Sequence, residues 1–208
     1  MKISWISDAG IRAETSQGLI LFNHDENSLT SSSQKDENTI AIFLNEDLKK
    51  ISEKKLVETT KVIFEPGEYE VNNIPIQSHA IRLNTESLDE SINIFSVISE
   101  GLTICYLNEI TKITIPANVT ESIGKIDILV CISNDSSDKS VESINSLLSS
   151  LDPRILLIAE KGNNLNVTEI YQKLIKGLGQ TPEDPINNAN ITKSSIPDAL
   201  KVVNLKKT

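Results

Sequence analysis

The chain has 208 residues, which is enough to bury a substantial core without a metal ion or a disulfide. Its hydrophobic fraction of 38%, with only 4% aromatic residues, excludes wholesale disorder and predicts a core of aliphatic side chains. The net charge of -9 argues against partners such as nucleic acid or an anionic membrane, and no apolar run is long enough to span a bilayer. We therefore expect a soluble, cytoplasmic protein.

The first half of the sequence alternates short apolar runs with turn signals, which predicts a region of mainly β-sheet. Its spacing and β-branched residues favour antiparallel hairpins, with turns at Asn72-Asn73 and at Ser99-Glu100-Gly101. The runs are "KISWI", "IRAE", "LILF", "TIAIFL", "KVIF", "YEV", "IPIQSHAI", "INIFSVI" and "LTICYL". Residues 23–38 are polar and have no apolar periodicity, so we expect a long mobile loop there.

The second half changes to a helical period. Apolar residues fall on one face over 138–151 and again over 166–178, with Asp138 and Asn166 as candidate N-caps and Gly179 as the stop. The apolar runs "IDILVCI" and "RILLIA" predict strands covered on both faces. A final pair of short strands is expected in "NITKSSIPDALKVVNL". Because no linker separates the halves, we expect one α/β domain spanning 1–208.

Four side chains with reactive groups are expected to have structural roles. Cys105 and Cys131 lie in apolar runs and are predicted to be buried, reduced thiols. His24 begins the polar loop and is expected to be exposed, whereas His79 is expected to be a strand residue with a satisfied ring nitrogen.

Several segments are familiar in their order and spacing. The segments are "MKISWIS", "FEPGEYEVNNIPI", "GLTICYLNEIT", "IGKIDILVCIS", "LDPRILLIAE" and "ITKSSIPDALKVVNL". They resemble the predicted zinc-dependent hydrolases of the metallo-β-lactamase fold over essentially the whole chain. The resemblance implies an α/β fold, a four-layer αββα sandwich, with metal ions bound at the edge between the two sheets.

The resemblance also locates the positions at which such hydrolases bind metal, and here the residues differ. The family motif H-x-H-x-D-H corresponds to "NEDLKK", and a family His-Leu-Gly-Asp corresponds to "YLNE" at 106–109. Ser7-Asp8 and Asn23-His24 replace a Gly-His and an Asp-Pro. The implied remnant site consists of Asp8, Asn45, Asp47, Lys49, Lys50, Tyr106, Glu109, Lys112 and Glu160. Since no family histidine ligand is retained, we expect neither catalytic residues nor zinc.

Three interpretations of the remnant positions remain open. Lys49, Lys50, Lys112 and Lys161 supply ammonium groups that replace the charge of the metal. Alternatively, Asp8, Asp47, Glu109 and Glu160 hold one hard divalent ion such as Mg²⁺ or Mn²⁺. The third possibility is that all of these are solvated loop charges.

The sequence accordingly supports more than one hypothesis about function. The first is a catalytically degenerate protein that binds an unknown protein or small ligand, acts as a scaffold, or assembles as a homo-oligomer. The alternative is a hydrolase that uses a divalent ion in the carboxylate-rich site. A third hypothesis places an interaction surface at an exposed sheet edge or an apolar patch, away from the remnant site.

Overall fold

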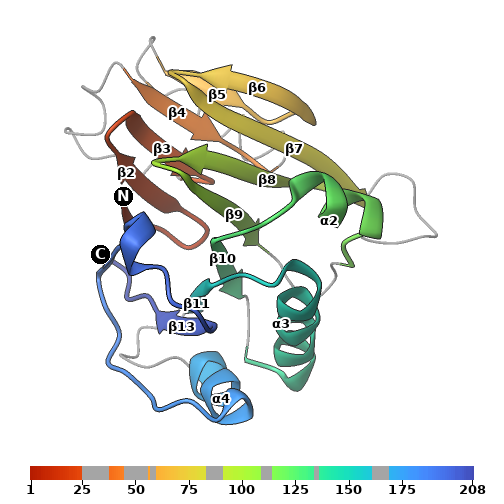
Figure 1. The fold of residues 1–208 in the computed structure, drawn as a ribbon, viewed down its shortest axis with the longest axis vertical. Helices are drawn as coiled ribbons and strands as arrows, with labels where there is room; N and C mark the ends of the chain where they lie inside the picture. Colours follow the sequence, from red (N-terminus) through yellow and green to blue (C-terminus); the bar gives the residue numbers. More distant parts are fainter. Residues whose placement is uncertain are drawn as a thin grey trace.

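Two β-sheets lie face to face, and helices pack against the outer side of one of them (Figure 1). The computed structural model describes residues 1–24, 38–44, 56, 60–82, 91–108, 114–133, 136–160 and 169–208. The two ends of the chain lie close together at the edge of the six-stranded sheet, where Thr208 donates to the carbonyl of Trp5.

The six-stranded sheet mixes antiparallel and parallel pairs. Its strands, in spatial order, are β12 (Asn188–Asn190), β1 (Lys2–Trp5), β2 (Ile11–Thr15), β3 (Gly18–Phe22), β4 (Thr39–Ile42) and β5 (Lys61–Ile63). The pairs from β12 to β3 are antiparallel, whereas β3–β4 and β4–β5 are parallel. The prediction of antiparallel hairpins is confirmed for β2 and β3 but wrong for the pairs β3–β4 and β4–β5, which are parallel.

The seven-stranded sheet has an antiparallel half and a parallel half. Its strands are β13 (Lys201–Asn204), β11 (Ile155–Glu160), β10 (Ile128–Ser133), β9 (Leu102–Asn108), β8 (Ser91–Ser99), β7 (Ile74–Arg82) and β6 (Gly67–Val71). Strands β13, β11, β10 and β9 are parallel. The remaining three follow as hairpins. Of the predicted final pair of strands, β13 lies within the predicted segment, whereas β12 overlaps that segment only at Asn190, and the two strands belong to different sheets.

Two tight turns confirm the predicted hairpins. Asn72 and Asn73 have φ values of 53° and 59° between β6 and β7, and Glu100 and Gly101 have values of 54° and 73° between β8 and β9. Positive φ at both central residues matches the twist of the flanking strands, and Asn and Gly adopt it at low cost. The conspicuous "FEPGEYEVNNIPI" is therefore a scaffold hairpin.

The space between the sheets is filled by aliphatic side chains, as the composition predicts. Ile20, Ile42, Phe95, Ile104 and Val130 all contribute fully or almost fully buried side chains to this core. The alternate side chains of β3 and β4 point the other way.

The helices cover the outer face of the seven-stranded sheet. They are α2 (Ala117–Ile123), α3 (Asp138–Leu151) and α4 (Glu169–Leu178), and they share a second core with that sheet. The N-cap of α3 is Ser137, which accepts a hydrogen bond from Ser140 N at 3.3 Å. Asp138 is therefore the first helical residue and not the cap as predicted. Helix α4 ends before Gly179 (φ 63°) as expected, while Asn166 lies outside the described residues.

The outer face of the six-stranded sheet is buried around β3 and β4. Leu21, Ala41 and Phe43 lie on that face and are at most 1% exposed, whereas Lys2 and Glu14 on the same face of β1 and β2 are partly exposed. Two facing sheets with flanking helices fit the predicted α/β sandwich. The thiols of Cys105 and Cys131 are free and buried, as predicted. Within the described residues, none of the helices has the length and apolar character needed to cross a membrane.

Candidate functional site

The remnant positions that are described lie where several strands end. The carboxyl ends of β9, β10, β11 and β13 point to one edge of the seven-stranded sheet, because these strands are parallel. The loop 6–10 after β1 and the residues after β3 and β4 reach the same edge through the contacts given below. The sandwich fold therefore brings short loops from both sheets together here.

Tyr106, near the end of β9, is the central side chain of this edge. It is fully buried, and its ring stacks on Phe22 with 5.0 Å between ring centroids. Its Oη donates a hydrogen bond to the carbonyl of Ala9 and accepts one from Asn23 Nδ2 at 3.4 Å. Burial raises the pKa of Tyr106 far above its usual value, so the side chain is a neutral phenol.

Asn23 extends this network to the strand beside it. Its Oδ1 accepts a hydrogen bond from Leu44 N at 2.9 Å, and its backbone N–H donates to Ile42 O at 2.8 Å. The side chain is 2% exposed, and its φ of 45° places it at a turn. The side-chain amide of Asn23 therefore links the ends of β3 and β4, in the six-stranded sheet, to the hydroxyl of Tyr106, in the seven-stranded sheet. We call Tyr106, Asn23 and the Ala9 carbonyl the Tyr106 network.

His24 is buried, and the prediction that it is exposed is wrong. Its side chain is 1% exposed, and its ring centroid lies 4.9 Å from that of Phe43 at a tilt of 45°. Phe43, the residue that follows β4, packs on the ring, and the local sequence around His24 does not reveal this contact. His79 lies in β7 as predicted, but its Nε2 has no hydrogen-bond partner in the described part of the chain.

The loop between β1 and β2 is packed tightly against this edge. Gly10 N donates to Ser7 O at 3.1 Å, and Gly10 O accepts from Ile6 N at 2.9 Å. A Cβ at Gly10 would lie 2.2 Å from Ser7 Oγ and 3.3 Å from the Cα of His24. The close approach requires glycine, and it fixes the Ala9 carbonyl next to Tyr106.

Asp8 is the one carboxylate of the remnant site whose side chain is described, and a lysine neutralises it. Lys207 Nζ lies 2.9 Å from Asp8 Oδ1, with both side chains about half exposed. The sequence suggested that ammonium groups replace the metal charge, but at Asp8 the ammonium comes from Lys207, which is not one of the four predicted lysines.

The other predicted site residues are tested only in part. Glu160 ends β11, as the resemblance implies, and its side chain is not described. Outside the described residues lie Asn45, Asp47, Lys49, Lys50, Glu109, Lys112 and Lys161. Among the residues that are described, no three His, Cys, Asp or Glu side chains come together in a way that could hold a metal ion.

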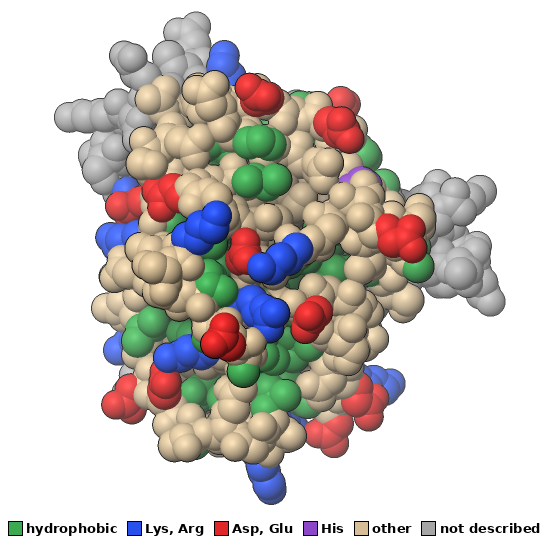
Figure 2. Space-filling model, in the orientation of Figure 1, with side chains coloured by type: hydrophobic (Ala, Val, Ile, Leu, Met, Phe, Trp, Pro, Cys, Tyr) green, Lys and Arg blue, Asp and Glu red, His purple; other side chains and the backbone are tan. Residues whose placement is uncertain are grey.

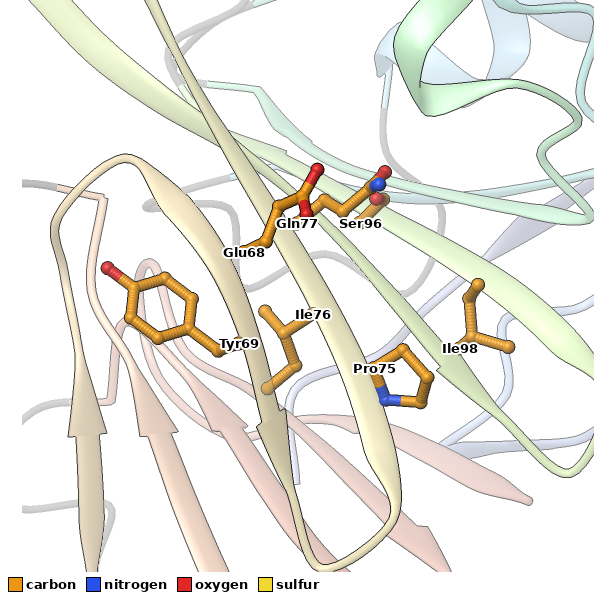
Figure 3. A pocket seen from close by; sticks show the side chains of 7 residues that line it. All are labelled: Glu68, Tyr69, Pro75, Ile76, Gln77, Ser96 and Ile98. Atoms are coloured by element: carbon orange, nitrogen blue, oxygen red, sulfur yellow. The ribbon is translucent and has the colours of Figure 1, made fainter.

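A small pocket of about 150 Å³ lies elsewhere, on the outer side of β6, β7 and β8. Figure 3 shows that Glu68, Gln77 and Ser96 bring their polar ends together, while Tyr69 points away from them. Pro75 and Ile98 form its apolar part, and Ile98 is 44% exposed. The pocket is lined, among the residues whose positions are described, by a single carboxylate and by no imidazole, thiol or lysine, so we assign it no catalytic role.

The fold and this edge define the class of protein to which the chain belongs. A family model described as a β-lactamase superfamily domain matches residues 2–158, so the chain belongs to this family. The resemblance inferred from the sequence is thereby confirmed. A search of curated proteins found no match.

Solved structures give the same result for the fold. A Thermotoga maritima protein, assigned to the Zn-dependent hydrolases of the metallo-β-lactamase superfamily, is 19% identical with a TM-score of 0.71, over 100% of this chain and 99% of that one. The Bacillus subtilis metallo-β-lactamase fold protein YhfI is 9% identical with a TM-score of 0.61, over 99% and 96%. A protein of Parabacteroides distasonis, assigned as a metal-dependent hydrolase, is 15% identical with a TM-score of 0.60, over 98% and 93%.

The described residues at this edge do not fit a zinc centre. Zinc requires neutral imidazole, thiolate or carboxylate ligands that point to one position. The edge instead offers a neutral phenol at Tyr106, an amide at Asn23 with its oxygen already bonded, and a carboxylate at Asp8 paired with Lys207. His24 is the single imidazole among the described residues of this edge, and its ring packs on Phe43.

Proposed function

We propose that this chain is a catalytically degenerate member of its family that uses no zinc and has a binding or scaffolding role. The Tyr106 network is the observation that carries the proposal. A phenol stands where the resemblance implies a histidine ligand, and its hydroxyl is already bonded to the Ala9 carbonyl and to Asn23. A side chain in this state stabilises the loop but has no lone pair directed at a metal.

The proposal leaves open whether the partner is another protein, a small ligand or a second copy of the chain. Self-assembly through the edge strand β6 is disfavoured, because Glu68 and Glu70 are exposed there and would face their counterparts in an identical strand. Size-exclusion chromatography with light scattering over a hundredfold concentration range distinguishes a monomer from a homo-oligomer.

The alternative function is a hydrolase with a hard divalent ion held by Asp47 and other carboxylates. It is tested with chromogenic phosphate and carboxylate esters in the presence of Mg²⁺ or Mn²⁺, using the wild type and Asp47→Ala. The degenerate protein gives the same background rate in both. A metal-dependent rate that Asp47→Ala removes would contradict the proposal and establish the hydrolase.

A further inference from the structure

A second polar pocket lies at the opposite end of the seven-stranded sheet from the Tyr106 network. Its volume is about 440 Å³, within the usual range for small-molecule sites. Thr103, Asp127 and Arg154 lie at or just before the amino ends of β9, β10 and β11. Because these strands are parallel, their amino ends lie at the edge away from Tyr106. The pocket is therefore distinct from the remnant metal site.

Three loops that are distant in the sequence bring basic side chains to this pocket. Lys125 precedes β10, Arg154 precedes β11, and Lys193 begins the short 3-10 helix η3 (Lys193–Ser195). Figure 2 shows Lys and Arg side chains together with acidic ones in the middle of the face that is viewed. In a chain with a net charge of -9, three cations in one concave site stand out.

The two carboxylates of the pocket are already engaged or turned to solvent. Asp127 Oδ2 accepts a hydrogen bond from Thr103 N at 2.9 Å, and its Oδ1 lies 3.7 Å from Lys125 Nζ. Asp198 is exposed, and its backbone carbonyl accepts a bond from Arg154 Nη1 at 2.5 Å. Glu100, in the adjacent turn, lies 2.6 Å from the amino group of Met1. Arg154 and Lys193 therefore retain capacity for a ligand, whereas Lys125 is loosely paired with Asp127.

Neither Arg154 nor Lys193 has an acidic partner among the described residues, and Arg154 is held in place by a backbone carbonyl. The bond to the Asp198 carbonyl fixes the Arg154 guanidinium and leaves its other N–H donors available. Lys193 lies over the glycine of the β8–β9 turn, since a Cβ at Gly101 would be in van der Waals contact with Lys193, 3.8 Å from its Nζ.

We infer that this pocket binds the phosphate group of a small organic phosphate, with Arg154, Lys125 and Lys193 as the binding residues. A guanidinium fork with two ammonium groups suits a tetrahedral dianion, because charge-assisted hydrogen bonds to phosphate are short and strong. The volume leaves space for an organic part beside the phosphate. The segments "IGKID", "DPR" and "TKSSIP", which also carry the family resemblance, are the ones that form this site.

The test is an NMR titration of the ¹⁵N-labelled protein with inorganic phosphate and with pyrophosphate at constant ionic strength. We expect saturable shifts at the backbone amides of Gly101, Thr103 and Arg154. Affinity should fall at least about tenfold in Lys125→Gln/Lys193→Gln, because each charged hydrogen bond that is lost costs about a factor of ten or more. Lys139→Gln, a change at an exposed residue of α3, is the matched control and should bind like the wild type.

Arg154→Gln is a second variant that distinguishes binding from folding. Its amide spectrum should keep the wild-type dispersion while the phosphate shifts disappear. Absence of saturable shifts in the wild type, or equal affinity in Lys125→Gln/Lys193→Gln, would overturn the inference. Equal affinity for citrate would overturn phosphate as the ligand class. The inference does not depend on the proposed function, because the phosphate pocket and the remnant metal site lie at opposite ends of the seven-stranded sheet.

Discussion

Removing the Tyr106 hydroxyl tests whether the network holds this edge together. Tyr106→Phe keeps the ring stacked on Phe22 but leaves the Ala9 carbonyl and the Asn23 side-chain amide without their partner. A buried polar group left unsatisfied costs roughly 1–3 kcal/mol. Since the Asn23 contact is long at 3.4 Å, we expect about 2 kcal/mol in total. For a chain of this size that corresponds to a fall in Tm of about 4–8 °C.

Urea unfolding followed by the fluorescence of Trp5 provides the assay, because this single tryptophan is 2% exposed and lies just before the loop 6–10. Tyr69→Phe is the matched control. Its hydroxyl donates to the Glu65 carbonyl at an exposed site, where water replaces it, so the expected loss is under about 0.5 kcal/mol. Equal stability of Tyr106→Phe and Tyr69→Phe would refute the view that the hydroxyl holds the loop.

Two further predictions concern groups packed near the same strands. Gly10→Ala should lower the free energy of unfolding by about 1–3 kcal/mol through overpacking. The double variant Ser7→Ala/Gly10→Ala should recover part of this loss, because Ser7 Oγ is the nearest atom to the new Cβ. If the double variant recovers no stability, the assigned clash is contradicted. Burial raises the pKa of Cys105 and Cys131 above the ordinary 9.0, so both thiols should resist a chromogenic disulfide reagent at pH 8 until the protein unfolds. Because the thiols lose their protons more easily in the unfolded chain, the free energy of unfolding should be unaffected below pH 9 and should decline as the pH rises further. An unfolding midpoint that does not change between pH 8 and 11 would contradict the raised pKa values.

The hairpins and the parallel unit could be predicted because their signals are local. Asn72, Asn73 and Gly101 are residue types that tolerate positive φ, and the apolar run of β10 matches a strand buried on both faces. The parallel pairing of β3 with β4 could not be predicted. The polar residues that join β3 to β4 have no apolar periodicity. Whether two strands pair in parallel depends on the path of the segment that connects them, and the sequence of either strand does not specify that path.

The site residues show the same limit. The burial of His24 results from Phe43, and the pairing of Asp8 with Lys207 joins residues 199 positions apart, so neither contact leaves a trace in the neighbouring sequence. The role of Tyr106 depends on the Ala9 carbonyl, a backbone atom that any residue would supply. The phosphate-binding inference likewise needs loops from four parts of the chain. Tertiary placement, not residue type, decides each of these cases.

The metal content of the untagged protein tests the central claim most directly. The protein is incubated with excess Zn²⁺, Mn²⁺ or Mg²⁺, desalted, and analysed by inductively coupled plasma mass spectrometry. Replacement of the family metal centre by the Tyr106 network predicts far less than one ion per chain after each incubation. Retention of about one ion per chain, lost in Asp47→Ala, would contradict the account and place a working metal site at this edge.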